Sequence, residues 1–323
     1  MNVLVTGGLG VVGAWVTRKL IERGLSVTVV DLSDDISLLG SLGDQVELVK
    51  TDIMDAEAMR ALFASRKIEC VVHLAAMIAG LQANPVEGFR LNALGTVQLL
   101  DAAHRAGVRR FVYTSSRAIY GDLLGKYGYP LYEPVPEDHP LGAKNVYDIT
   151  KLATELMGRN FARAGLEFVA LRSSTIFGPG KLIRHGAFSI YGRFIENAMK
   201  GVPLVIPKGG DERDDVIYVD DVAQGCLLAV THPKPNYQEY NISRSVGTTL
   251  GQFADEVKRF FPDADISIGP GLDFYEAGVK YAGVLDHRRA REDLGFVPRF
   301  DLRAAIEDYI AETGALGLPI TVT

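Results

Sequence analysis

The first 31 residues contain the pattern that most constrains how this chain can fold. Residues 3–5 are apolar, residues 7–13 contain four glycines, and a helical apolar spacing follows. A second apolar run at residues 27–30 is rich in β-branched side chains and leads directly into Asp31. A strand, glycine turn, helix, strand and terminal acid within about 30 residues are typical of a dinucleotide-binding unit.

The glycine turn predicts a site for a pyrophosphate. Glycines let the backbone approach the ligand closely, and the helix N-terminus offers free N–H groups and a positive dipole end. The residues expected to contact the dinucleotide here are Gly7, Gly10, Val11, Val12 and Gly13. A purely structural turn without a ligand is the alternative interpretation.

The identity of the dinucleotide follows from Asp31. Its carboxylate should accept hydrogen bonds from the adenosine ribose hydroxyls, and a 2′-phosphate there would meet a negative charge. Residues 32–35 supply no arginine that could offset this repulsion. The sequence therefore predicts NAD rather than NADP.

Composition and charge narrow the classes of partner. The chain has 323 residues, a formal net charge of −6 and a pI near 5.6, which argues against nucleic acid or an anionic membrane as a partner. Two well-separated cysteines suggest a reducing compartment, and the longest apolar run, residues 70–81, is too short to span a bilayer. With a strand starting at residue 2, we expect no signal peptide and a cytoplasmic protein. The six histidines show no metal-binding spacing, so no metal site is expected.

Strands and helices alternate through the first half of the chain. Further strands are expected at residues 46–49, 70–74, 110–113 and 168–171, with helices at 56–64, 85–106 and 146–164. This alternation predicts an α/β fold, a Rossmann-type doubly wound parallel sheet with ligands at the carboxyl ends of its strands.

The pattern changes after residue 171, where strands shorten and Gly and Pro cluster. Helices are expected near residues 188–200, 221–230, 250–260 and 302–313. We therefore predict an NAD-binding domain over residues 1–172, with later interleaved segments near 214–242. A smaller substrate-binding domain is expected over residues 173–323, with a cleft between the two.

Three groups of polar residues are candidates for the chemistry. Tyr147 and Lys151 lie one helical turn apart, and a neighbouring ammonium lowers the pKa of a phenol. Thr114 to Ser116 follow a strand, where a hydroxyl could hydrogen-bond the reacting oxygen. Asn92 lies within a helix. Each group also has a structural interpretation. The Tyr–Lys pair could be exposed, the hydroxyls could cap a loop or helix, and the Asn92 amide could be solvated.

These motifs together make a family resemblance plain. The matching stretches are residues 6–13, 51–53, 71–76, 92–96, 114–121, 147–151, 213–222 and 286–298, which cover nearly the whole chain. The sequence resembles the extended short-chain dehydrogenase/reductases, and within them the NAD-dependent epimerase/dehydratase family with its sugar-nucleotide epimerases.

The resemblance implies a role for several residues. Tyr147 would be the general base, Lys151 would set its pKa and hold the nicotinamide ribose, and Ser116 would be the hydroxyl partner. It also implies a homodimer formed through the helices that hold Asn92 and Tyr147. Besides Asp31, Tyr147 and Lys151, the expected cofactor contacts outside the glycine turn are Asp52, Ile53, Leu74, Ala75, Ala76, Asn92, Thr114 and Ser174.

The chain departs from the family pattern just after Ser116. Arg117 and Ala118 stand where the sugar-nucleotide 4,6-dehydratases carry an Asp-Glu pair, so no acid is available to eliminate water. Arg117 could instead bind a carboxylate or phosphate of the substrate. An arginine paired with Asp122 or Glu137 is the alternative.

The substrate stays open at this point. Arg213 fits the arginine that reaches a sugar-nucleotide diphosphate, but Thr175 stands where the family has Asn, and Lys280 where a second arginine is usual. We expect a 4-epimerase-like oxidoreduction at a secondary alcohol carbon of a sugar or sugar nucleotide, with Ser116, Arg117, Thr175, Arg213 and Lys280 at the substrate. The alternatives are an NAD-dependent dehydrogenase of a small polar hydroxy compound, such as a hydroxy acid held by Arg117, and a non-catalytic NAD-binding regulator.

Overall fold

A seven-stranded parallel sheet forms the centre of the computed structural model, which describes residues 1–78, 80–185, 189–276 and 278–322. The strand order is β10-β6-β5-β4-β1-β2-β3, so the chain winds outward from β1 in both directions. The strands are β1 (Asn2–Thr6), β2 (Ser26–Asp31), β3 (Glu47–Lys50), β4 (Cys70–His73), β5 (Arg110–Ser116), β6 (Glu167–Ser173) and β10 (Glu239–Ile242).

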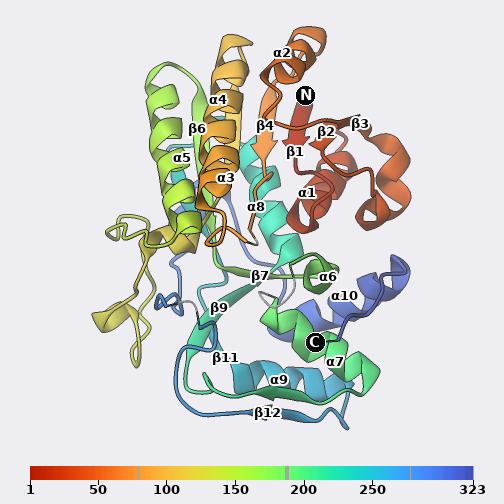
Figure 1. Cartoon of the computed structure of the whole chain (residues 1–323), viewed down its shortest axis with the longest axis vertical. Coiled ribbons are helices and arrows are strands. Elements are labelled where there is room, and N and C mark those ends of the chain that lie inside the picture. Colours follow the sequence, from red (N-terminus) through yellow and green to blue (C-terminus); the bar gives the residue numbers. More distant parts are fainter. Residues whose placement is uncertain (79, 186–188, 277, 323) are drawn as a thin grey trace.

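Helices cover both faces of this sheet (Figure 1). One face carries α1 (Val11–Glu22) and α8 (Val219–Thr231), and the other carries α2 (Ala56–Ser65), α4 (Thr96–Arg105) and α5 (Val146–Arg163). Successive residues of β1 enter the two cores in turn, with Val3 and Val5 in one and Leu4 in the other. Burial on both faces explains why these strands read as continuous apolar runs.

The predicted α/β fold and its elements are confirmed. Each of the six strands expected in the first half lies in the sheet, and the later helices are observed as α7 (Ile190–Lys200), α8, α9 (Leu250–Phe260) and α10 (Leu302–Ala315). The expected start of the first of these, residue 188, lies outside the described residues. The single helix expected over residues 85–106 is α3 (Pro85–Phe89) and α4 joined by a π-helical segment, Arg90–Gly95.

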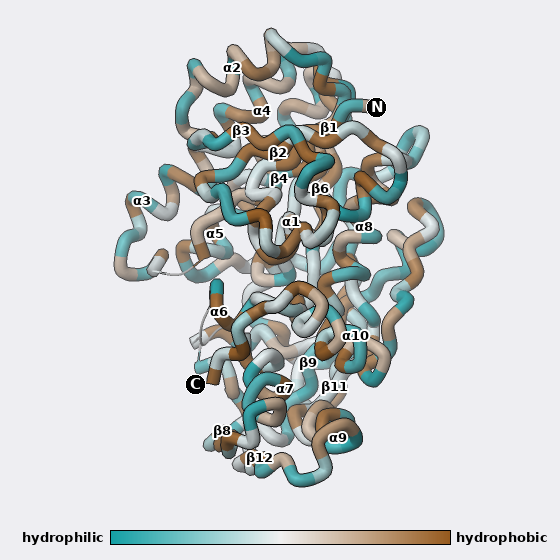
Figure 2. The backbone as a smooth tube through the Cα atoms, turned by 90° about the vertical axis from the view of Figure 1, so that its right-hand side faces the viewer, coloured by the Kyte–Doolittle hydropathy of each residue, from teal (hydrophilic) through white to brown (hydrophobic). Residues whose placement is uncertain are grey.

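Smaller sheets, which lie below the main sheet in both views, make up much of the second half (Figures 1 and 2). One sheet has the order β11-β9-β7, from β11 (Gly247–Thr249), β9 (Arg213–Tyr218) and β7 (Thr175–Phe177). A second pairs β8 (Leu204–Ile206) with β12 (Ile266–Ile268). The division into two domains stays a prediction, although α8 and β10 pack with the first-half sheet as the interleaved segments would. The remaining short elements are α6 (Lys181–His185), the 3-10 segments Ser37–Gln45, Arg117–Tyr120 and Gly125–Tyr127, and the π-helical segment Ala290–Leu294.

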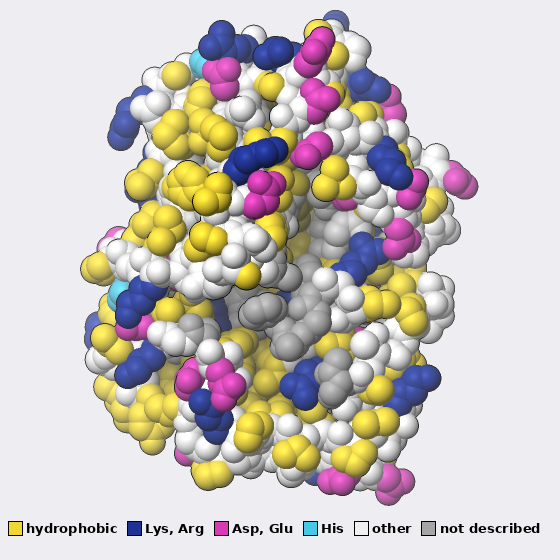
Figure 3. Space-filling view, viewed as in Figure 1, with side chains coloured by type: hydrophobic (Ala, Val, Ile, Leu, Met, Phe, Trp, Pro, Cys, Tyr) yellow, Lys and Arg dark blue, Asp and Glu magenta, His cyan; other side chains and the backbone are white. Residues whose placement is uncertain are grey.

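An apolar patch lies on the surface of α3, the π-helical segment Arg90–Gly95 and α5. Val86 is 80% exposed and Leu156 is 53% exposed. Several exposed large apolar side chains on one face are uncommon on the surface of a monomer. Figure 3 shows hydrophobic side chains gathered over this side of the molecule, at the upper left. We define the apolar patch as Val86, Phe89, Leu94, Ile149, Leu156 and Met157.

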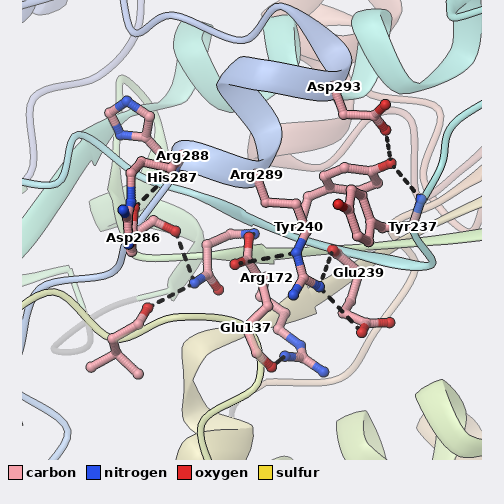
Figure 4. Close-up of polar contacts among 12 residues, drawn as sticks. Glu137, Arg172, Tyr237, Glu239, Tyr240, Asp286, His287, Arg288, Arg289 and Asp293 are labelled. Carbon is pink, nitrogen blue, oxygen red and sulfur yellow. Dashed lines mark hydrogen bonds and ion pairs between the residues drawn. The ribbon is translucent and has the colours of Figure 1, made fainter.

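A polar network attaches the loop after β5 and the late segment around residue 289 to the main sheet (Figure 4). Arg172 of β6 donates to the backbone oxygen of Glu137 at 2.8 Å. Arg289 pairs with both Glu137 and Glu239, at 3.6 and 3.3 Å. Tyr240 of β10 hydrogen-bonds Asp293. This network fixes the loop that connects the end of β5 to α5, and therefore the two elements that carry Ser116 and Tyr147. Among the described residues, no helix combines the length and apolar character needed to cross a bilayer.

Candidate active site

A cavity of about 450 Å³ opens at the carboxyl ends of the parallel strands. This is where ligands bind in open α/β sheets. Its lining includes nearly all the residues expected to contact the dinucleotide: Gly7, Gly10, Val11, Val12, Gly13, Asp31, Asp52, Ile53, Leu74, Ala75, Ala76, Thr114, Tyr147 and Lys151. The cavity thus extends from the glycine turn to the Tyr–Lys pair.

The glycine turn is packed so tightly that side chains cannot enter it. Gly7 has a φ of +68°, and a Cβ there would lie 2.7 Å from the backbone nitrogen of Ala75. A Cβ on Gly13 would lie 2.0 Å from the backbone oxygen of Gly7. Gly10 provides the N-cap of α1 without a side-chain hydrogen bond. The first turn of α1 therefore presents its N–H groups to the cavity without a competing side chain.

This packing predicts that Gly13→Ala disrupts the cofactor site. The added methyl group must push the turn apart, so we expect a loss of about 1–3 kcal/mol in the free energy of unfolding and a weakened affinity for NAD⁺. Gly314→Ala in α10 is the matched control, because nothing lies within 4 Å of its Cβ. That helix substitution should stabilise the protein by about 0.5–1 kcal/mol. Denaturant unfolding and NAD⁺ titration measure both effects, and equal behaviour of the two variants would contradict the prediction.

Asp31 is held in place at the end of β2 by two backbone groups. Its Oδ2 accepts from the Leu9 nitrogen at 3.0 Å and its Oδ1 from the Ser33 nitrogen at 3.0 Å. The carboxylate therefore connects the glycine turn to the chain after β2. Its expected contact with the adenosine ribose stays a prediction, and its position in the cavity lining agrees with that role.

Tyr147 and Lys151 line the other end of the cavity, whereas Ser116 contacts Tyr147 without belonging to the lining. Asn145 and Asp148 form a capping box that starts α5, which places Tyr147 in its first turn. Burial raises the pKa of the Tyr147 phenol to about 12, and its hydrogen bond with Ser116 lowers it in part. The Lys151 Nζ lies 5.6 Å from the centre of the Tyr147 ring and donates to the backbone oxygen of Thr114 at 2.7 Å. Burial lowers the pKa of this lysine to about 8, although Glu155 raises it.

Ser115 belongs to the candidate group Thr114 to Ser116, although the family resemblance assigns the hydroxyl role to Ser116. The Ser115 hydroxyl oxygen is buried and has no hydrogen-bond partner among the described residues, yet the residue lines the cavity near Tyr147. A buried hydroxyl without a partner costs free energy unless a ligand satisfies it. Its place between Thr114 and Ser116 was the only signal available in the sequence.

Two residues expected at the cofactor do not line the cavity. Asn92 is buried, and its side-chain amide makes two 2.8 Å hydrogen bonds with the backbone of Met77, which itself lines the cavity. The Ser174 hydroxyl donates to Asp215 Oδ1 at 3.3 Å, and Ser173 lines the cavity instead. Both differences arise because side chains alternate in direction at strand ends and around helices.

Arg117 forms a buried ion pair with Asp214 of β9. Both side chains are nearly inaccessible, at 8% and 0% exposed. Burial opposes the charge on Arg117, but Asp214 outweighs it and raises the pKa of the guanidinium. Asp214 also accepts from the hydroxyls of Thr175 and Tyr275, each at 2.8 Å. The partner is neither Asp122 nor Glu137, the two acids considered from the sequence.

The other residues expected at the substrate are dispersed. Thr175 belongs to the Asp214 cluster just described. The side chains of Arg213 and Lys280 are exposed, and the backbone nitrogen of Lys280 donates to Asp122 at 2.9 Å. The structure brings neither cation into the cavity lining. Across the part of the chain that the structure describes, no group of three or more His, Cys, Asp or Glu residues is arranged to hold a metal ion.

The glycine turn, the cavity and the unpartnered hydroxyl of Ser115 fit a dinucleotide, and the Tyr147–Lys151 pair lies where its reactive end would be. Fold and site together define a short-chain oxidoreductase. The sequence model of the "NAD dependent epimerase/dehydratase family" matches residues 3–243. The chain belongs to this family, and its cofactor is NAD.

Individual relatives extend the match to almost the whole chain. The UDP-glucose 4-epimerase of Mycolicibacterium smegmatis is 31% identical over 317 residues, which cover 95% of this chain and 96% of that protein. A crystal structure of UDP-glucose 4-epimerase with UDP-glucose from Thermotoga maritima superimposes with a TM-score of 0.83 at 30% identity, covering 97% of this chain and 99% of that one. The Thermus thermophilus UDP-glucose 4-epimerase complex with NAD gives a TM-score of 0.80 at 26% identity, covering 96% and 99%.

Proposed function

We propose that this protein is a 4-epimerase of a UDP-hexose, with UDP-glucose and UDP-galactose as the pair to test first. The observation that carries the proposal is the Tyr147–Lys151 pair in the lining of the cavity that also contains the glycine turn, with Ser116 hydrogen-bonded to the Tyr147 phenol. The similarity to UDP-glucose 4-epimerases over nearly the whole chain supports the substrate class.

Tyr147 is the proposed general base. NAD⁺, held by the glycine turn and Asp31, would supply the hydride acceptor for oxidation at the sugar C4 and the hydride donor for the return step. Tyr147 takes the proton of the C4 hydroxyl as the hydride leaves, which yields a 4-keto sugar, and gives the proton back after the ketone has turned its other face. Ser116 hydrogen-bonds the same oxygen and shares its proton with the phenol.

Lys151 makes this base usable at neutral pH. Burial alone raises the pKa of the Tyr147 phenol, so a positive charge nearby must stabilise the phenolate. The ammonium of Lys151 supplies one such charge and the nicotinamide ring of NAD⁺ a second. Its bond to the Thr114 backbone oxygen fixes its position on α5 relative to β5.

The competing reactions have less support at this site. Arg117 and Ala118 provide no acid for a dehydration, and Arg117 is already paired with Asp214 rather than available to a substrate carboxylate. A hydroxy-acid dehydrogenase would need such a free cation. Arg213 and Lys280 stay our candidates for the UDP diphosphate, and Thr175 for the sugar.

A direct assay tests the proposal. Catalytic amounts of the protein are incubated with UDP-glucose and an excess of NAD⁺, and the sugar anomeric signals are followed by proton NMR together with absorbance at 340 nm. We expect UDP-galactose to accumulate to an equilibrium mixture without net formation of NADH. Steady release of NADH and no epimer would favour the dehydrogenase, and absence of any reaction with UDP-hexoses would reject this substrate class.

We propose in addition that the apolar patch forms a homodimer interface. Exposed side chains such as Val86 and Leu156 on adjacent helices would be buried by the same surface of a second copy. Leu156→Arg should convert the dimer to a monomer at micromolar concentration, measured by gel filtration with light scattering. Val205→Arg on β8, where Val205 is 66% exposed, is the control and should leave the mass unchanged. A wild-type monomer, or a dimer that persists in the Leu156→Arg variant, would contradict this assignment.

We place the protein in the cytoplasm. Cys70 and Cys226 are both free and buried, and burial raises the pKa of each thiol to about 12. Such thiols behave as inert core side chains, as expected of a protein that works in a reducing compartment.

A further inference from the structure

An arginine from the second half of the chain reaches the glycine turn. Arg184 lies on α6, about 150 residues beyond Asp35 in sequence, and its guanidinium donates to the backbone oxygen of Leu9 within the turn. It also pairs with Asp35, just after β2, at 2.8 Å. Arg184 lines the same cavity as Gly10 and Val11.

The charged side chains that line the cavity indicate which of them could bind a phosphate. The charged side chains in its described lining are Asp31, Asp52, Lys151 and Arg184. Lys151 is fixed at the far end by its bond to Thr114, and Asp31 is held against the glycine turn. A pyrophosphate carries two negative charges, so a cation beside the glycine turn would add to the stabilisation that the N–H groups of α1 provide. Arg184 is the cationic side chain of this lining that contacts the glycine turn.

We propose that Arg184 binds the pyrophosphate of NAD and thereby ties the second half of the chain to the cofactor. A guanidinium has five N–H donors in a planar fork that matches phosphate oxygens, and the contacts with Leu9 and Asp35 use two of them. The inference depends on NAD as the cofactor and not on the sugar nucleotide. A failure of the proposed epimerisation would therefore leave it untouched.

A purely structural latch is the competing explanation. Arg184 could hold the glycine turn and Asp35 together without touching a ligand. Asp35 separates the two possibilities, because its side chain is 54% exposed and serves as a partner of Arg184. If the latch is what matters, removing either partner has the same effect. If the charge matters, removing Asp35 releases the guanidinium and leaves phosphate binding unchanged or stronger.

The experiment compares Arg184→Ala, Arg184→Lys and Asp35→Asn. Dissociation constants for NAD⁺, ADP-ribose and adenosine are measured by calorimetry or NMR titration on cofactor-depleted protein. We expect Arg184→Ala to weaken the affinities for NAD⁺ and ADP-ribose by about 10- to 100-fold, the range for a lost charge-assisted contact. The affinity for adenosine should stay unchanged. Arg184→Lys should retain part of the affinity, and Asp35→Asn should bind NAD⁺ at least as tightly as the wild type.

Two results would overturn the proposal. One is an unchanged NAD⁺ affinity in Arg184→Ala. The other is an equal loss for adenosine and ADP-ribose in Arg184→Ala that Asp35→Asn reproduces, which would establish the structural latch. Thermal unfolding of the ligand-free variants accompanies the titrations, so that a folding defect is recognised as such.

Discussion

Replacing Tyr147 with phenylalanine should lower turnover by about 100- to 10,000-fold, the usual contribution of a positioned general base. The ring is retained, so the packing of α5 against β5 and the contact with Lys151 persist, while the hydroxyl that takes the sugar proton is lost. The rate of UDP-hexose interconversion gives the effect directly. The affinity for NAD⁺ should change little, because a phenylalanine ring fills the same space at the cavity end.

Tyr129→Phe is the matched control for this experiment. Tyr129 is 56% exposed in the loop between β5 and α5, and it does not line the cavity. Its variant should turn over at the wild-type rate. An unchanged rate in Tyr147→Phe would remove Tyr147 as the base, whatever the substrate proves to be.

Loss of Asp214 should destabilise the protein more than any other single change considered above. Asp214→Ala leaves the guanidinium of Arg117 buried without a counter-ion, which costs about 3–5 kcal/mol. Replacing both members of the pair with leucine, Arg117→Leu with Asp214→Leu, should recover most of this loss because no isolated charge is then buried. The free energy of unfolding from urea titration measures each value.

An exposed pair provides the comparison. Asp34 pairs with Lys50 at 2.7 Å on the surface, and Asp34→Ala should leave the unfolding midpoint nearly unchanged. If Asp214→Ala is tolerated equally well, Arg117 must be solvated or bound by another group. That outcome would return Arg117 to consideration as a substrate-binding cation.

Local patterns predicted the fold well because the Rossmann-type half is built from them. The apolar runs of the sheet strands, the helical spacing of α5 and the glycines before α1 are each encoded within a few residues. The π-helical segment between α3 and α4 escaped prediction because its residues keep a helical spacing on either side. The short strands β8 and β12 carry too few residues for a periodic signal.

The site was predictable where its residues lie on one element. Tyr147 and Lys151 share a face of α5, and the glycine turn is contiguous in sequence. Contacts between distant segments were not predictable, and two of them change the account: Arg117 with Asp214, and Arg184 with Asp35. Residues 32–35 contain no arginine, so nothing local to Asp31 predicts a cation beside the glycine turn. The folded chain supplies Arg184 from α6.

The fate of the hydrogen at C4 tests the central claim most directly. UDP-galactose carrying deuterium at C4 is incubated with the protein in ordinary water, and the product is analysed by NMR and mass spectrometry. If a transient 4-ketone forms in the site, the same hydride returns to its opposite face, so we expect UDP-glucose that keeps the deuterium at C4. Product that has lost the label to solvent or to free NADH, or the absence of any epimer, would contradict the account.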